Sequence, residues 1–203
     1  MSNRLAPTQS RAATGGRDDW RTPPELIAAV CDRWKVSIGL DVACTSSNMV
    51  DGAAMGFRFD LGENGLDLDW TIARKATLTA NASTSVVWCN PPYSRVGDWM
   101  ARARNEAHMN GVRSVCLVPV RTDTGWWTAS VHRPVVIPYG AARVTLLKGR
   151  VKFIAPPGSD SPAAQSAPFP SCLVWYEPGH AAPPQYEVWD WSWWLKNRQQ
   201  MTP

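Results

Sequence analysis

The sequence predicts one α/β domain, with an open sheet that is covered by helices on both faces. Short apolar runs typical of buried strands alternate along the chain with segments of helical periodicity. The chain has 203 residues, which fits a single domain, and 44% of them are hydrophobic, enough for a complete core. In an open α/β sheet, ligands bind at the carboxyl ends of the strands, so functional residues are expected there.

The first predicted element is a helix that follows an N-terminal arm. Residues 1–17 are rich in small and polar residues, which is typical of a disordered arm. In the TPPE motif that follows, Thr22 is the expected N-cap, Pro23 the first helical residue, and Glu25 the partner that closes a capping box. The helix is predicted to end near Trp34.

Seven short apolar segments are predicted to be strands. They are residues 36–43, 85–89, 114–118, 135–137, 143–147, 151–154 and 171–176. The first carries Asp41 near its end, and the second is stopped by two prolines, which cannot donate to a sheet ladder. The segments 143–147 and 151–154 are expected to form a hairpin around Gly149.

The other segments are predicted to be helices and loops. Helices are expected over residues 96–109 and 124–131. The Pro-, Ser- and Ala-rich residues 155–170 are expected to form a loop. Residues 188–198 contain four of the 12 tryptophans of the chain and are predicted to form an amphipathic helix.

The expected organisation is a disordered arm over residues 1–17, one domain over 18–177 and a Trp-rich tail over 178–203. The N-terminus lacks the apolar core of a secretory signal, and no run approaches the roughly 18 apolar residues of a membrane span. We therefore expect a cytoplasmic protein, a monomer or a weak dimer, with no membrane partner.

The cysteines and histidines indicate neither a metal site nor a disulfide framework. The number of cysteines, five, is odd, and the sequence has no Cys-x-x-Cys motif. The three histidines have no nearby Cys or His at the spacing of metal ligands. Reduced, mostly buried thiols and no bound metal are expected.

The net charge of +4 conceals a strong segregation along the chain. Residues 18–89 hold six basic and ten acidic residues, whereas residues 90–155 hold ten basic and three acidic ones. Arginine outnumbers lysine, which favours forked recognition of phosphates or guanine edges. The second half of the chain is therefore predicted to bind a polyanion.

The motif Asn90-Pro91-Pro92-Tyr93 directly follows an apolar strand and carries the clearest chemistry. It resembles motif IV of the S-adenosylmethionine-dependent amino-methyltransferases. The acceptor of such an enzyme can be an aromatic amine, which is a poor nucleophile because its lone pair is delocalised into the ring. The side-chain carbonyl of Asn90 and the backbone carbonyl of Pro91 are placed to accept its two N–H groups and to aim its lone pair. Pro92 restricts the backbone, and Tyr93 offers an aromatic face for a flipped base. The same four residues are also compatible with an ordinary turn after a strand.

Further motifs narrow this resemblance. In chain order they are Asp19-Trp20-Arg21-Thr22-Pro23, Leu40-Asp41-Val42-Ala43, Gly65-Leu66 with Asp69-Trp70, Trp88 to Ser94, Pro119 with Arg121 to Thr124, Gly149 to Phe153, and Ser161-Pro162. Together, over about residues 18–177, they are similar to the phage-type Dam family of DNA N6-adenine methyltransferases.

The resemblance implies a Rossmann-like methyltransferase sheet, S-adenosylmethionine as cofactor and double-stranded DNA as partner. It implies that Thr22 and Pro23 contact the methionine end of the cofactor, and that Asp41 faces its ammonium or sulfonium. Asp60 and Asn64 are the candidates for its ribose and adenine. Each of these polar residues is also compatible with a role as a cap or a turn. The glycine-rich cofactor loop of larger methyltransferases is absent after Asp41.

The DNA contacts implied by the resemblance fall in the basic half of the chain. Arg121 and Thr122 follow a predicted strand and are candidates for the base pocket or a phosphate contact. Lys148 and Arg150 flank the predicted hairpin and are candidates for contacts in a groove. The expected reaction is direct in-line methyl transfer to N6 of a flipped adenine. RNA or protein glutamine as acceptor, and a catalytically silent DNA-binding module, are the alternatives.

Overall fold

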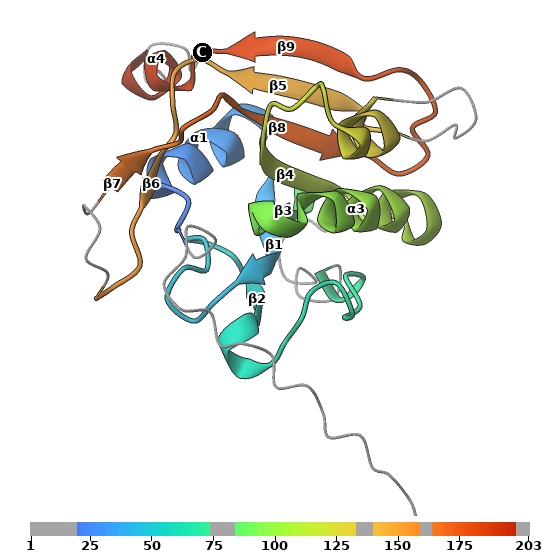
Figure 1. The fold of residues 1–203 in the computed structure, drawn as a ribbon, viewed down its shortest axis with the longest axis horizontal. Helices are drawn as coiled ribbons and strands as arrows, with labels where there is room; N and C mark the ends of the chain where they lie inside the picture. The colour runs from blue at the N-terminus through green and yellow to red at the C-terminus, as the bar shows by residue number, and fades with distance from the viewer. Residues whose placement is uncertain (1–19, 74–83, 133–139, 159–163, 198–203) are drawn as a thin grey trace, which may run out of the picture.

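Seven strands form the main sheet of the protein (Figure 1). The computed structural model describes residues 20–73, 84–132, 140–158 and 164–197. Along the chain, the strands of this sheet are β1 (Ser37–Cys44), β2 (Met55–Arg58), β3 (Ser85–Cys89), β4 (Ser114–Pro119), β5 (Arg143–Leu147), β8 (Ser171–Tyr176) and β9 (Gln185–Trp189). Their spatial order is β2-β1-β3-β4-β8-β5-β9.

The sheet is mostly parallel. Strand β1 pairs in parallel with β2 and β3, β3 with β4, and β5 with β9. Strand β8 is antiparallel to both of its neighbours, β4 and β5. Because β1, β3 and β4 run in one direction, their carboxyl ends lie at the same edge of the sheet. The mixed α/β single domain predicted from the sequence is confirmed.

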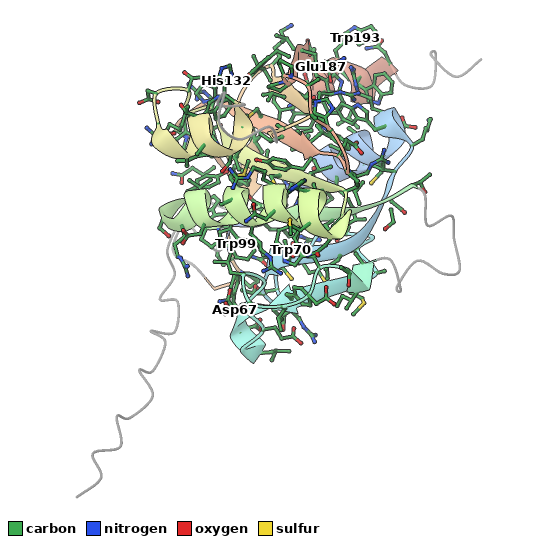
Figure 2. All side chains as sticks on the ribbon, turned by 90° about the vertical axis from the view of Figure 1, so that its right-hand side faces the viewer. Asp67, Trp70, Trp99, His132, Glu187 and Trp193 are labelled. Atoms are coloured by element: carbon green, nitrogen blue, oxygen red, sulfur yellow. The ribbon has the colours of Figure 1, made fainter. Side chains whose placement is uncertain are left out.

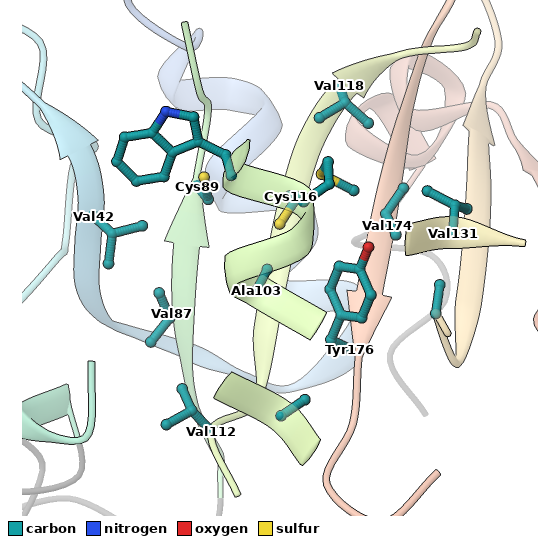
Figure 3. Packing of buried hydrophobic residues seen from close by; sticks show 14 of the residues in the cluster. Val42, Val87, Cys89, Ala103, Val112, Cys116, Val118, Val131, Val174 and Tyr176 are labelled. Atoms are coloured by element: carbon teal, nitrogen blue, oxygen red, sulfur yellow. The ribbon is translucent and has the colours of Figure 1, made fainter. Parts of the chain in front are cut away.

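Helices cover both faces of the sheet, because its central strands carry apolar side chains on both. Helix α3 (Val96–Asn110) packs on one face, against Val87, Cys116 and Val174. Figure 3 shows this cluster, with Ala103 of the helix among the strand residues. Helices α1 (Pro24–Trp34) and α4 (Trp191–Asn197) cover the opposite face. The five cysteines form no disulfide, and four of them are buried.

Two tryptophans and a glycine fix the turn that follows β2. The rings of Trp70 and Trp99 stack with their centroids 6.4 Å apart (Figure 2). The indole Nε1 of Trp70 donates a hydrogen bond of 2.6 Å to the carbonyl of Gly65. A Cβ atom on Gly65 would overlap the carbonyl oxygen of Val42 and lie 3.0 Å from the Trp99 ring. Glycine is therefore required at this position, where the turn meets the end of β1.

Helix α1 begins one residue later than predicted. Its N-cap is Pro23, Pro24 is the first helical residue, and no side chain caps the helix. Either proline suits the first turn, since the N–H groups there have no intrahelical partner. The prediction of Thr22 as N-cap is therefore wrong. The hydroxyl of Thr22 is buried and has no hydrogen-bond partner among the described residues.

The hairpin predicted around Gly149 does not form. Strand β5 pairs with β8 and β9, whereas β6 (Lys152–Ile154) pairs with β7 (Ala164–Ser166) in a separate two-stranded sheet. Strand β7 lies within residues 155–170, which were expected to be loop, so that prediction is also wrong. Three-residue strands are too short to show a period in the sequence. The two small strands stand beside the main sheet in Figure 1.

The C-terminal segment contributes a strand that the sequence analysis missed. Strand β9 pairs with β5 and buries Trp189, and the helix predicted over 188–198 is the shorter α4. The guanidinium of Arg33 in α1 lies 4.9 Å from the ring of Trp34, 5.1 Å from Trp189 and 5.6 Å from Trp194. These cation–π contacts join the segment to α1.

Of three further predicted segments, one is described by the structure and two are not. The helix predicted over 124–131 ends in a π-helix, η5 (Trp127–Val131). The arm over residues 1–17 and the strand over 135–137 lie outside the described residues. Among the helices of the described chain, none has the length and apolar character that crossing a membrane requires.

Candidate active site

A pocket opens where the chain leaves β3 at the carboxyl edge of the sheet, and its volume is about 210 Å³. It contains three of the four residues of the Asn90–Tyr93 motif. Its lining consists of Trp20, Asn90, Pro91, Tyr93, Phe153, Gln165, Ser166, Ala167, Pro168 and Phe169. Four of these side chains are aromatic, so the pocket presents flat apolar walls around a few polar groups.

The side chain of Asn90 is oriented by the segment that precedes α1. Its Nδ2 donates a hydrogen bond of 3.3 Å to the backbone carbonyl of Trp20. Its Oδ1 is buried and has no hydrogen-bond partner among the described residues. Since buried polar atoms are rarely left without a partner, this oxygen is an acceptor available to a ligand in the pocket.

Aromatic rings close the pocket on the side of the small sheet. The rings of Tyr93 and Phe169 meet edge to face, with centroids 5.3 Å apart. Phe153 of β6 is buried, with 6% of its surface exposed. The guanidinium of Arg121 lies 5.8 Å from the ring centroid of Phe169, so a positive charge stands close to the aromatic wall.

The segment Trp20–Thr22 joins the pocket to two other parts of the fold. The backbone of Arg21 exchanges two hydrogen bonds with Ile154 of β6, of 2.9 and 3.0 Å. The guanidinium of Arg21 forms an ion pair with Asp51, in the loop after β1. Trp20 lines the pocket, and the hydroxyl of Thr22 is buried. A shift of this segment would therefore displace the pocket wall and the β1 loop together.

Asp41 is a buried carboxylate in the middle of β1, with 2% of its surface exposed. It accepts hydrogen bonds from the backbone N–H groups of Ala43, at 3.3 Å, and Val50, at 3.0 Å. Burial raises the pKa of Asp41 to about 7, although these two hydrogen bonds lower it. No ion pair between described residues involves Asp41, so its charge has no cation beside it.

Asp60 and Asn64 hold turns at the β2 side of the sheet. The Asp60 carboxylate is exposed and accepts a hydrogen bond of 2.9 Å from the N–H of Ser46. Hydrogen bonds from the side chain and backbone of Ser46 keep the pKa of Asp60 below its usual value. Asn64 donates to Asp67 at 2.5 Å and accepts from the N–H of Leu66 at 3.2 Å.

None of the five predicted cofactor residues lines the pocket. The loop after β1 connects two of them, because Val50 donates to Asp41 and Ser46 donates to Asp60. Neither of these acids lines the pocket around Asn90.

The predicted DNA-binding residues differ in their surroundings. Arg121, Thr122 and Arg150 are exposed, and neither arginine takes part in an ion pair between described residues. Lys148 is also exposed, but its Nζ pairs with the carboxylate of Asp190 at 2.7 Å. Lys152, in β6, is exposed and likewise has no ion pair among the described residues.

Sequence reasoning missed the wall that β7 and the residues after it contribute. Gln165 and Phe169 lie in the segment expected to be loop, and no local pattern marks them. Phe153 belongs to the Gly149–Phe153 motif, so the family resemblance could have indicated it as a site residue. Its position in the pocket depends on the pairing of β6 with β7.

Comparison with known proteins adds one finding. A family model described as DNA N-6-adenine-methyltransferase (Dam) matches residues 9–188. No curated protein and no solved structure matches the chain. The matched region contains the whole pocket lining.

Proposed function

The chain belongs to the DNA N-6-adenine-methyltransferase (Dam) family, and we propose that it transfers a methyl group from S-adenosylmethionine to N6 of adenine in double-stranded DNA. Beyond family membership, one observation carries the proposal. The buried Oδ1 of Asn90 has no partner among the described residues and lies in a pocket with aromatic walls.

The fold supports a Rossmann-like methyltransferase sheet. Its β1, β3 and β4 are parallel and buried on both faces by helices. The pocket lies at the carboxyl end of β3, where open α/β sheets bind their ligands.

Asn90 and Pro91 supply the acceptors that the reaction requires. The Oδ1 of Asn90 accepts one N–H of the adenine amine, and the carbonyl of Pro91 accepts the other. Both interactions strengthen as positive charge grows on the attacking nitrogen, so they stabilise the transition state more than the ground state. Because Nδ2 is held by the carbonyl of Trp20, the amide does not have to reorient when the base arrives.

The pocket suits a base that has left the duplex. Its volume of about 210 Å³ is below the roughly 300–1,000 Å³ of pockets for drug-sized ligands, which favours one planar base. Tyr93 provides a ring face against which the base stacks, and Pro92 fixes the backbone between Tyr93 and the acceptors. The apolar aromatic walls lower the local polarity and strengthen the hydrogen bonds at Asn90.

The residues present also fit S-adenosylmethionine. Asp41 is a buried carboxylate without a cation among the described residues, which matches the positive methionine end of the cofactor. Thr22 contributes a buried hydroxyl without a described partner, next to Pro23 at the start of α1. Asp60, after β2, and Asn64, in the following turn, are our candidates for the ribose and adenine. When bound, the cofactor supplies an electrophilic methyl group on its sulfonium.

The chain's own groups position the amine for in-line displacement. No general base is needed, because the amine loses its proton after it has attacked, when it has become acidic. Asn90 and Pro91 orient the nitrogen, and proximity accounts for most of the rate enhancement.

The DNA contacts are assigned to the exposed basic residues near the pocket. Arg121 and Thr122 follow β4, and Arg121 stands over the aromatic wall. Arg150 precedes β6 and Lys152 belongs to it, and Lys148 is the weaker candidate because its charge is paired with Asp190.

Methylation with isotope-labelled S-adenosylmethionine tests this function. We expect label in N6-methyladenine after nuclease digestion of duplex DNA incubated with the protein. Label in RNA or in glutamine of a protein substrate would show that the methyl acceptor is not adenine in DNA. DNA binding without cofactor binding by calorimetry, and without label, would show a catalytically silent DNA-binding module.

A further inference from the structure

We propose that Gln165 is a specificity residue of the pocket, whose side-chain amide donates a hydrogen bond to a ring nitrogen of the target adenine. The inference rests on the proposed function. It concerns a residue of the small β6–β7 sheet, outside the Asn90–Tyr93 motif.

The pairing of β6 with β7 directs Gln165 into the pocket. Gln165 lies directly opposite Phe153 in this antiparallel pair. Residues directly opposite each other project from the same face of a sheet. Phe153 is buried, and both side chains line the pocket. Gln165 therefore faces the same space as the Oδ1 of Asn90, from another wall.

The amide of Gln165 is available for a ligand. No hydrogen bond joins its side chain to any residue within the described ranges, and the residue is exposed. The other amide in the pocket, that of Asn90, already uses its Nδ2 on the carbonyl of Trp20. Gln165 thus carries the uncommitted amide donor of the pocket.

The chemistry of adenine calls for such a donor. With both N6 hydrogens accepted by Asn90 and Pro91, the hydrogen-bonding groups left next to the amine are the ring nitrogens N1 and N7, and both are acceptors. A glutamine amide is a standard partner for the adenine edge. Guanine presents a carbonyl at C6, which cannot donate to Asn90, and an N–H at position 1. The acceptor at Asn90 therefore rejects guanine, and a donor at Gln165 adds to this rejection at position 1, whereas at N7 it binds adenine without distinguishing it from guanine.

The test combines protein variants with altered bases. The DNA target is first mapped by methylation-sensitive sequencing of DNA from cells that express the protein. Duplexes are then made with adenine, 1-deazaadenine or 7-deazaadenine at the target. The variant Gln165→Met removes the amide at similar length, and Gln165→Glu places a carboxylate against the ring nitrogen. Gln185→Met, on β9 and outside the pocket lining, is the matched control.

We expect Gln165→Met to lower kcat/KM on the natural duplex by about 3- to 10-fold, as for one lost hydrogen bond. Gln165→Glu should lower it further, and Gln185→Met should not change it. One of the two deaza bases should lower the kcat/KM of wild type by a similar factor. The same base should leave the kcat/KM of Gln165→Met at its value on the natural duplex. The analogue that does so identifies the ring nitrogen. Cofactor KM and melting temperature should be unchanged.

Two kinetic results would overturn the proposal. One is wild-type activity in Gln165→Met, and the other is a deaza effect that is equally large in wild type and Gln165→Met. Binding to a duplex with 2-aminopurine at the target provides a second measurement, because its fluorescence reports on unstacking of the base. If both variants, Gln165→Met and Gln165→Glu, bound this duplex with the affinity and fluorescence of wild type, the proposal would also be refuted. A wild-type protein that does not methylate adenine would refute the proposed function instead, before Gln165 is tested.

Discussion

Asn90→Ala separates a catalytic role of this side chain from a structural one. The substitution removes the Oδ1 proposed to accept an N–H of the substrate amine. Removal of one preorganised hydrogen-bonding group that stabilises a transition state typically lowers kcat by about 100- to 1,000-fold. We expect a loss of this size, with cofactor binding still measurable by calorimetry.

The structure also predicts the effect on stability. The change removes one long hydrogen bond, from Nδ2 to the carbonyl of Trp20, worth about 0.5–1.5 kcal/mol. It also removes a buried acceptor without a described partner, whose burial costs about 1–3 kcal/mol. The balance is a change in the free energy of unfolding of about −0.5 to +2.5 kcal/mol. An inactive variant whose stability is close to or above that of wild type is therefore expected.

Urea denaturation and single-turnover methylation test both halves of this prediction. The matched control is Asn110→Ala, which removes the hydrogen bond of 2.9 Å to Glu106 at the end of α3 and should lower stability without changing kcat. Unchanged turnover in Asn90→Ala, or a loss of stability larger than that of the control, would refute the reasoning.

Three further predictions concern the buried Asp41, the DNA surface and the core. Because burial raises the pKa of Asp41 from 3.8 to about 7, the wild type should lose unfolding free energy as pH rises through this interval, and Asp41→Asn should lack that decline in urea denaturation. In fluorescence titrations, Arg150→Ala should reduce the slope of the logarithm of DNA affinity against the logarithm of salt concentration by about one. Lys148→Ala should reduce this slope by less, because the charge of Lys148 is paired with Asp190. Gly65→Ala should lower the free energy of unfolding by about 1–3 kcal/mol, whereas Gly125→Ala, with no atom within 4 Å of its new Cβ, should change it little.

The sequence predicted the part of the site that is contiguous in the chain. Asn90 and Tyr93 belong to one motif after one buried strand, and both line the pocket. The two faces of the sheet and helix α3 were also predicted, because long periodic segments carry a strong signal. What these segments share is that local sequence determines their structure.

The features that were missed depend on pairing between distant segments. Gln165 and Phe169 reach the pocket because β7 pairs with β6, and no local pattern encodes that pairing. Strand β9 was missed because its residues are exposed on one side and precede a tryptophan cluster read as a helix. The error at Thr22 has another cause: two consecutive prolines are both compatible with the first helical turn.

The position of β8 in the sheet has a consequence for synthesis of the chain. Among the described strands, β5 pairs with β8 and β9, and both follow it in the sequence. On the ribosome, β5 therefore has no neighbour among these strands until residues 171–176 have been made, and β4 remains an open edge for the same time. Such edges invite pairing with other chains, so the interval between β5 and β8 is the aggregation-sensitive stage of folding. Truncation before Ser171 would make that stage permanent.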